Sequence, residues 1–262
     1  METLKLIALP YAALGLGIGL LVGVTGVGGG SLMTPLLILL FGIHPVTAVG
    51  TDLLFAAATK SVGTLVNGLH HTVAWRVTGL LAAGSLPAAG ATLVLVARMG
   101  LQDQAASTLV RGVLAVVLLL TALSLVGRRY VIALAQARLL DVGPRGTVIL
   151  TVATGAVVAV LVSLTSVGAD AVGIVGLLLL YPRMPIARII GSDIAHAVPL
   201  TLLAGIGHWL MGSVNWPMLG SLLVGSVPGI VIGSYANVHV PERLLRAVLA
   251  VTLTAVAVRT IL

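Results

Sequence analysis

The chain is a succession of apolar segments separated by short clusters of Gly, Pro, His and Arg. Several segments approach or exceed the roughly 18 to 20 residues that a helix needs to cross a bilayer, and strand-like alternation is absent. With 59% hydrophobic and 8% charged residues and a mean hydropathy of +1.19, the sequence lies far above a soluble globular domain. It predicts an all-α polytopic membrane protein with about 8 to 10 membrane segments. These are 6–24, 31–43, 47–67, 78–97, 109–127, 147–165, 171–181, 189–207, 218–236 and 244–262.

The net charge of +7 is interpreted as a topology signal. Arg128, Arg129, Arg138 and Arg145 flank one central polar segment, which the positive-inside rule places in the cytoplasm. Nucleic-acid binding is not expected. Cysteine is absent, which excludes disulfides and thiolate metal sites, and no cofactor is expected.

Two of the segments, 31–43 and 171–181, are too short for an ordinary crossing and are predicted to be broken or re-entrant helices. They occupy corresponding places in the two halves of the chain. Short or interrupted segments at corresponding positions are typical of transporters built from internal repeats.

A repeat is visible in the sequence. Thr25-x-Val27-Gly28 matches Thr165-x-Val167-Gly168 and, after one inserted residue, Gly50-Thr51-Asp52 matches Gly191-Ser192-Asp193. Further matches in the same register are Trp75 with Trp216 and Gly84-Ser85-x-Pro87 with Gly225-Ser226-x-Pro228. The sequence thus predicts two homologous transmembrane repeats, 1–127 and 147–262, joined by a basic cytoplasmic linker, 128–146. Five crossings per half would invert the repeat and four would not; the discontinuous helices favour inversion.

The stretch from Thr25 to Pro35 is a Gly-rich turn between two apolar segments. Glycine lets the backbone approach a ligand, and the amides that open the following helix carry partial positive charge, so the turn is predicted to bind an anion. The alternative is that small residues simply let helices pack tightly. In the second copy, Ala169 and Asp170 replace Gly29 and Gly30. An acidic residue there would repel an anion, so the two turns are expected to do different jobs.

Ionisable residues inside apolar segments form the second candidate site. Such residues are functional hypotheses by default. Lys60 is expected to attract an anion, and Asp193 with His196, three residues apart on one helical face, to carry a coupling proton. Asp52 and Lys60 lie about 12 Å apart along a helix axis, too far for a direct pair. The alternative is that Asp52 and Asp193 cap helices near the membrane surface.

The remaining polar residues point to anchoring rather than to catalysis. Trp75 and Trp216 at segment edges are expected at the headgroup level. The neighbouring His70 and His71 do not share a helical face, and no carboxylate or Cys accompanies them, so no metal site is expected. No known catalytic motif is present, and an enzyme is disfavoured.

The pattern Gly26-x-Gly28-Gly29-Gly30-x-Leu32-x-Thr34-Pro35, followed by His44-Pro45-x-x-Ala48-x-Gly50-Thr51 and echoed by Gly191-Ser192-Asp193, resembles the TauE/SafE family of sulfite exporters. The likeness covers nearly the whole chain. It implies a multi-pass permease of the bacterial inner membrane that moves small, often sulfur-containing anions such as sulfite or organosulfonates.

The leading hypothesis is therefore a permease for small oxyanions that works by alternating access between two repeats, with a site between the broken helices. It would act in the lipid bilayer, as a homodimer. A membrane-embedded enzyme or sensor and a cation or proton channel remain the alternatives. The predicted substrate-binding residues are Thr25, Gly26, Gly28, Gly29, Gly30, Ser31, Thr34, Thr51, Lys60, Thr165, Ser166 and Gly168, and the coupling candidates are Asp52, Asp170, Asp193 and His196.

Overall fold

The described helices follow the predicted apolar segments, and the predicted segment 244–262 lies outside the described residues except for residue 254. The computed structural model describes residues 8–25, 30–69, 71–99, 112–113, 115–121, 123, 143–168, 172–235 and 254, and no strand occurs within them. The helices are α1 (Leu9–Thr25), α2 (Gly30–Phe41), α3 (Pro45–Leu69), α4 (Trp75–Met99), α6 (Pro144–Thr165), α7 (Ile174–Leu180), α8 (Ile186–Leu210) and α9 (Trp216–Tyr235). Residues 112–113 and 115–121 are helical too. The prediction of an all-α protein is confirmed.

The two segments expected to be short are short helices. Helix α2 has 12 residues and α7 has 7, so at about 1.5 Å per residue neither crosses a bilayer core of about 30 Å. Helix α6 begins at Pro144, inside the predicted linker, because proline suits the first turn, where its missing N–H has no partner to lose. Residues 128–142 of that linker lie outside the described residues.

Three of the described helices are long and apolar enough to cross a membrane. They cover Trp75–Arg98, Pro144–Thr165 and Ile186–Leu210, and shorter apolar helices cover Leu9–Leu21, Leu32–Phe41 and Trp216–Ile232. Large apolar side chains stand on their outer surfaces, as on Leu95, Ile149 and Leu210. An outward apolar surface suits contact with lipid, and the chain is a membrane protein.

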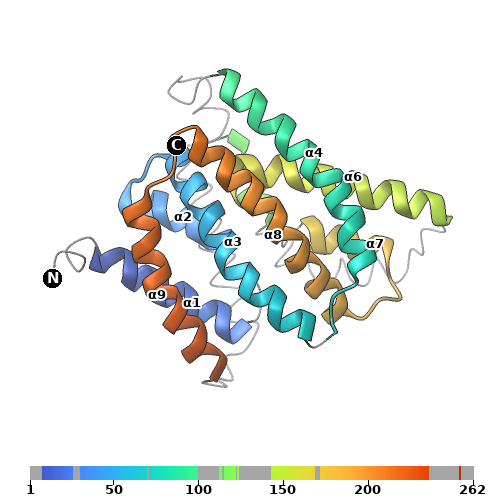
Figure 1. The fold of residues 1–262 in the computed structure, drawn as a ribbon, viewed down its shortest axis with the longest axis horizontal. Helices are drawn as coiled ribbons and strands as arrows, with labels where there is room; N and C mark the ends of the chain where they lie inside the picture. Colours follow the sequence, from blue (N-terminus) through green and yellow to red (C-terminus); the bar gives the residue numbers. More distant parts are fainter. Residues whose placement is uncertain are drawn as a thin grey trace.

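Helices α3 and α8 lie side by side in the centre (Figure 1). They run antiparallel, because Gly50 near the start of α3 meets His208 near the end of α8, and Gly63 near the end of α3 meets Ile194. Helix α1 packs against α9, and α4 packs against α6 and α8. The centre is therefore enclosed by a helix pair on either side.

Glycines let the two helices within each outer pair, α4 with α6 and α1 with α9, pack closely against one another. A Cβ on Gly84 of α4 would overlap the carbonyl oxygen of Val152 in α6, and a Cβ on Gly225 of α9 would overlap that of Ala12 in α1. Small residues at such crossings let two backbones approach, which is how membrane helices gain packing energy. The glycines of the Thr25–Pro35 turn, for which binding and packing are the two interpretations, are not tested by these crossings.

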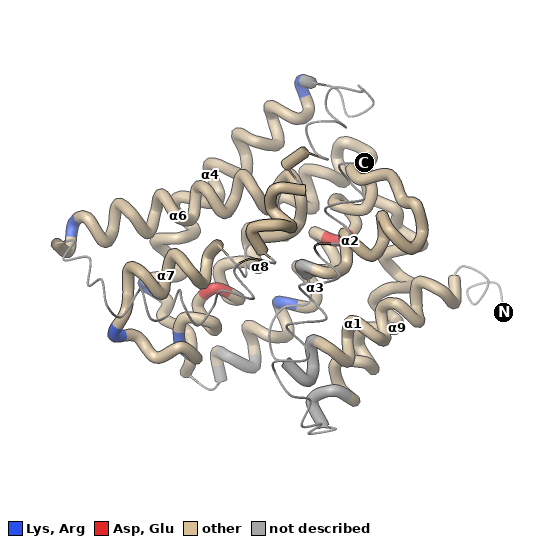
Figure 2. The backbone as a smooth tube through the Cα atoms, turned by 180° about the vertical axis from the view of Figure 1, so that it is seen from behind, with Lys and Arg blue, Asp and Glu red and all other residues tan. Residues whose placement is uncertain are grey.

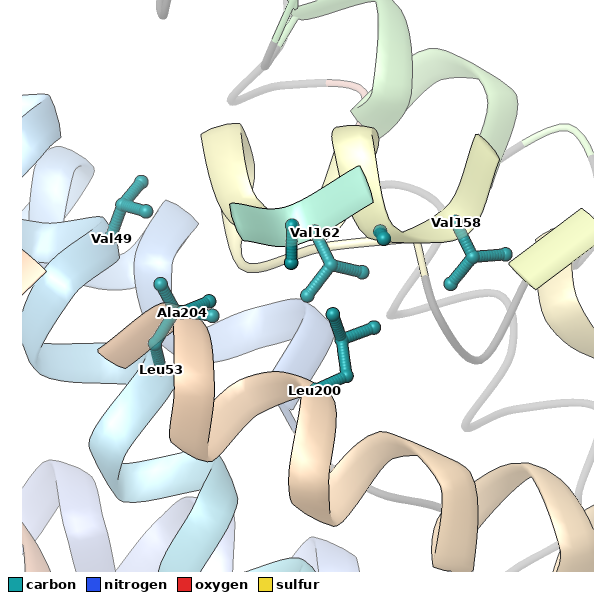
Figure 3. Packing of buried hydrophobic residues seen from close by; sticks show 8 residues of the cluster. Val49, Leu53, Val158, Val162, Leu200 and Ala204 are labelled. Carbon is teal, nitrogen blue, oxygen red and sulfur yellow. The ribbon is translucent and has the colours of Figure 1, made fainter. Parts of the chain in front are cut away.

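An apolar cluster fills the space where α3, α4, α6 and α8 meet. It contains Val49, Leu53, Ala89, Val158, Ala159, Val162, Leu200 and Ala204, all buried (Figure 3). Its members come from both halves of the sequence. This cluster and the glycine crossings together fix the helices that carry the polar residues described below.

The crossing of α4 and α6 makes a testable prediction. Replacing Gly84 by Ala should lower the free energy of unfolding by about 1–3 kcal/mol, because the added Cβ forces the backbones apart. Gly90→Ala on the same helix is the control, since no atom lies within 4 Å of a Cβ there. The measurement is thermal unfolding in detergent, and equal melting temperatures for the two variants would contradict the close crossing.

Candidate functional site

Two carboxylates are buried in the centre of the molecule. Asp52 on α3 is 0% exposed and Asp193 on α8 is 1% exposed, and they are the two acidic residues in the described part of the chain (Figure 2). The alternative that they cap their helices is wrong. Helix α3 begins at Pro45 and α8 at Ile186, about two turns before each aspartate, so tertiary packing surrounds both side chains.

Asp52 is held by α2, the short helix that follows the Gly-rich turn. The backbone N–H and the hydroxyl of Thr34 both donate to Oδ2 of Asp52, at 3.1 and 2.6 Å. The other oxygen, Oδ1, has no hydrogen-bond partner among the described residues. Two donors on one oxygen satisfy half of the carboxylate and tie α2 to α3.

The second predicted turn lies at the interior end of α6. Thr165 is the last residue of that helix, Ser166 adopts a left-handed conformation (φ 59°), and Gly168 follows with φ 105°. The Ser166 N–H bonds the Val162 carbonyl, and the Thr165 hydroxyl bonds the Leu161 carbonyl. Thr165, Ser166 and Gly168 are buried. The C-terminus of α6, which carries the negative end of the helix dipole, therefore lies in the interior.

The two halves meet where this turn reaches Asp52. The Ser166 side chain lies beside the Asp52 carboxylate without closing a hydrogen bond of standard geometry, and the hydroxyl has no partner among the described residues. A polar group left unpaired in the interior costs about 1–3 kcal/mol. Unsatisfied oxygens from two helices that face one another mark a place where a ligand would be stabilised.

Lys60 is the one buried residue among the lysines and arginines of the described ranges. It is 5% exposed, whereas Arg76, Arg98, Arg145, Arg183 and Arg188 are all exposed. Basic residues otherwise gather at the ends of helices (Figure 2). Lys60 lies two turns beyond Asp52 on α3 and acts electrostatically on both Asp52 and His196.

Two histidines tie α8 to its neighbours. Nε2 of His196 lies 2.9 Å from the hydroxyl of Ser85 on α4, while its Nδ1 has no partner among the described residues. Nε2 of His208 lies 2.9 Å from the carbonyl oxygen of Ser163 on α6. Ser85 and Ser163 had no assigned role in the sequence. Only the repeated Gly-Ser-x-Pro motif singled out Ser85.

Two reciprocal contacts, which we call the clasps, fix α3 and α8 to the loops of the opposite half. The N–H of Asn215 donates to Oγ1 of Thr51 at 3.0 Å, and the N–H of Ala74 donates to Oγ of Ser192 at 2.8 Å. The adjacent Gly50 and Gly191 let these loops approach, because a Cβ would lie 2.9 and 2.6 Å from carbonyl oxygens of the loops. Each aspartate directly follows a clasp in the chain.

Asp193 sits against the start of α7. A Cβ on Gly173 would collide with Oδ1 of Asp193, so glycine is required for the carboxylate to reach the backbone there. Trp75 and Trp216 are exposed at the first residues of α4 and α9, and no group of three metal-ligating side chains occurs in the described ranges.

Several predicted residues lie outside the described part of the chain. Gly26, Gly28, Gly29 and Asp170 fall on residues that the structure does not describe, and the side chains of Thr25 and Ser31 and the surroundings of Gly30 are not described either. Thr34 and Ser166 are brought to Asp52, and Lys60 acts on it electrostatically from two turns away on the same helix. Thr51 and Thr165 are buried with their hydroxyls in the contacts given above.

The clasp on α8 gives a prediction. Ser192→Ala should lower the free energy of unfolding by about 1–3 kcal/mol, because the buried N–H of Ala74 loses its acceptor. Ser61→Ala is the matched control, since that hydroxyl bonds the Ala57 carbonyl within its own helix. Thermal unfolding in detergent measures both, and a Ser192 variant no less stable than the Ser61 variant would rule out the clasp.

Comparison with known proteins places the chain in a family. The family model described as "Sulfite exporter TauE/SafE" matches residues 11–260. The probable membrane transporter protein YjnA of Bacillus subtilis (strain 168) is 35% identical over 238 residues, which cover 90% of this chain and 93% of YjnA. The probable membrane transporter protein YdhB of the same organism is 25% identical over 239 residues, 90% of this chain and 92% of YdhB. No solved structure matches. The chain belongs to the sulfite exporter TauE/SafE family of membrane transporters.

Proposed function

We propose that the protein carries small oxyanions, such as sulfite or an organosulfonate, across the bacterial inner membrane. The observation that carries this proposal is Lys60, a buried cation on the central helix α3. Charged side chains inside membrane segments are rare, and they mark substrate and ion pathways. One lysine attracts an anion without binding it too tightly for release.

The proposed site lies between α2 and α3 of one half and the α6–α7 turn and α8 of the other. Lys60 would supply the charge. Thr34, whose hydroxyl donates to Asp52, and Ser166 would line the site beside that carboxylate. Gly26, Gly28 and Gly29 are proposed to add backbone N–H donors, with Thr25, Gly30 and Ser31 at the edge of the same turn. Thr51, Thr165 and Gly168 are proposed to pack behind the residues that contact the anion and to hold those residues in position.

We also propose that the two halves form an inverted repeat and alternate in their access to the two membrane faces. The support is a set of paired contacts. Gly15 meets Leu222 as Gly155 meets Leu81, and the two clasps occupy equivalent places in the repeat. The equivalent helices α3 and α8 run antiparallel, as a twofold axis in the membrane plane requires. A homodimer is proposed as the assembled form.

A cation or proton channel is the second candidate. The observation in its favour is that both described carboxylates are buried in the centre while their helices span the molecule. It predicts cation flux that persists when Lys60 is neutralised. A membrane-embedded enzyme predicts a chemical product, and the membership of a transporter family argues against it.

The test is flux into proteoliposomes that contain the purified full chain. Sulfite, sulfoacetate and sulfate are offered in turn, with potassium as the cation control. Lys60→Met should lower oxyanion flux by roughly 10- to 100-fold, because a hydrogen bond to a charged group contributes about 1.5–3 kcal/mol and about 1.4 kcal/mol corresponds to tenfold. Lys60→Arg should retain part of the flux, since it keeps the charge.

The control variant is Arg145→Met, which removes an exposed charge at the start of α6 and should transport like the wild type. Thermal unfolding of each variant separates loss of transport from loss of folding. A folded Lys60→Met protein with unchanged oxyanion flux would overturn the proposed site, and wild-type protein that moves none of the oxyanions would overturn the proposed function.

A further inference from the structure

We propose that Asp52 and Ser166 bind the monovalent cation, sodium or a proton, whose movement is coupled to the anion. The inference rests on the proposed function, because coupling requires a transported anion. The place is defined by the described chain: the carboxylate of Asp52 on α3 and the hydroxyl of Ser166 at the end of α6 lie beside one another in the interior. Local charge, unsatisfied oxygens and a difference between the two halves all point to this place.

The oxygens themselves favour a cation. Thr34 supplies two donors to Oδ2 of Asp52, but Oδ1 and the Ser166 hydroxyl have no hydrogen-bond partner in the described ranges. Asp52 is 0% exposed and Ser166 is 6% exposed. A proton on Oδ1, or a sodium ion held by Oδ1 and Oγ, would satisfy both groups, because carboxylate and hydroxyl oxygens are ligands for hard cations.

The end of α6 adds to the negative potential. Its last four residues, 162–165, are buried, and a helix C-terminus carries about half a negative charge. The Thr165 hydroxyl lies within hydrogen-bond distance of the carbonyls of Leu161 and Val167, and the Ser166 N–H donates to the carbonyl of Val162. They relieve those carbonyls without donating to Asp52. Discontinuous transporter helices use the same combination of C-terminal carbonyls and carboxylates to coordinate sodium or protons.

The other charged and titratable groups near the centre do not take the position that the proposed cation would have beside Asp52. Lys60 acts on Asp52, but it lies two turns away on the same helix, about 12 Å along the axis. On α8, the imidazole of His196 is bonded to Ser85, that of His208 to Ser163, and Asp193 faces the start of α7. Ser85 offers its hydroxyl to His196, whereas His208 meets the backbone carbonyl of Ser163 and the hydroxyl of Ser213. Lys60 serves the anion in this arrangement, and the two ions occupy neighbouring places.

The corresponding place in the other half has different chemistry. In the register that pairs Thr25 with Thr165, Thr34 corresponds to Ile174 and Ser166 corresponds to Gly26. Neither Ile174 nor Gly26 has a side-chain hydroxyl, so the repeat does not supply Asp193 with counterparts of Thr34 and Ser166. The proposed cation site is therefore the one at Asp52.

The experiment measures sulfite flux in proteoliposomes with either a sodium gradient or a proton gradient imposed, each in the absence of the other. One of the two should accelerate wild-type flux, and this identifies the cation. Asp52→Asn should lose the acceleration and keep downhill flux, and Ser166→Ala should require a higher sodium or proton concentration for half-maximal acceleration. Thr154→Val on α6 is the control, since that exposed hydroxyl bonds the Leu150 carbonyl of its own helix.

A second measurement separates this inference from the proposed function. Binding of radioactive sodium, and proton uptake by lightly buffered protein on acidification, are followed in detergent without any anion. Wild-type protein that binds a cation at Asp52 but moves no oxyanion would overturn the function alone. Wild-type flux that ignores both gradients, or acceleration that survives in a folded Asp52→Asn protein, would overturn the cation site. Asp52→Glu, which keeps the carboxylate, should restore part of the response if the asparagine variant folds poorly.

Discussion

The antiparallel contact of α3 with α8 is the constraint on which the rest of the molecule depends. In a bilayer there is no hydrophobic driving force between apolar helices, because lipid tails are as apolar as their side chains. Helix association therefore relies on close packing and on hydrogen bonds. Gly50, Gly191 and Gly205 remove the side chains that would hold the two backbones and their loops apart. The hydroxyls of Thr51 and Ser192 then accept N–H groups of the loops. Packing and hydrogen bonding thus act at the same points.

The positions of the buried charges follow from that contact. Asp52 and Asp193 each come one residue after a clasp hydroxyl, and one residue is about 100° of rotation around a helix. With the hydroxyl turned to the loop, the carboxylate turns to the centre. A buried carboxylate costs several kcal/mol unless donors surround it, and Thr34 supplies two of them to Asp52. Asp52 therefore holds the short helix α2 in place, while Thr34 of α2 stabilises the Asp52 carboxylate.

The sequence predicted the elements better than their contacts. Hydropathy and the Gly and Pro clusters located the helices within a few residues, because these are local signals. The interpretation of Asp52 as a helix cap failed because Gly50-Thr51-Asp52 looks like a helix start, whereas α3 begins at Pro45 and tertiary packing explains the glycine. The bond from His196 to Ser85 joins residues 111 apart, and no periodicity marks a single polar pair across such a distance. The Gly-rich turn was visible in the sequence, but its role still depends on residues that the structure does not describe.

The two halves share their packing and differ in their chemistry. In the register that pairs Asp52 with Asp193, Lys60 corresponds to Thr201 and His196 to Phe55. Phe55 packs in an apolar cluster with Met218 and Leu222, whereas His196 bonds Ser85. If the two halves exchange conformations during transport, each half adopts the arrangement that the other half gives up. Because the halves share their packing, the inward-open and outward-open states are then close in packing energy. The bias between states then comes from the residues that break the symmetry. A carrier must bind its ion firmly enough to select it and loosely enough to release it, and one lysine with one hydroxyl-lined carboxylate meets both demands better than two identical sites would.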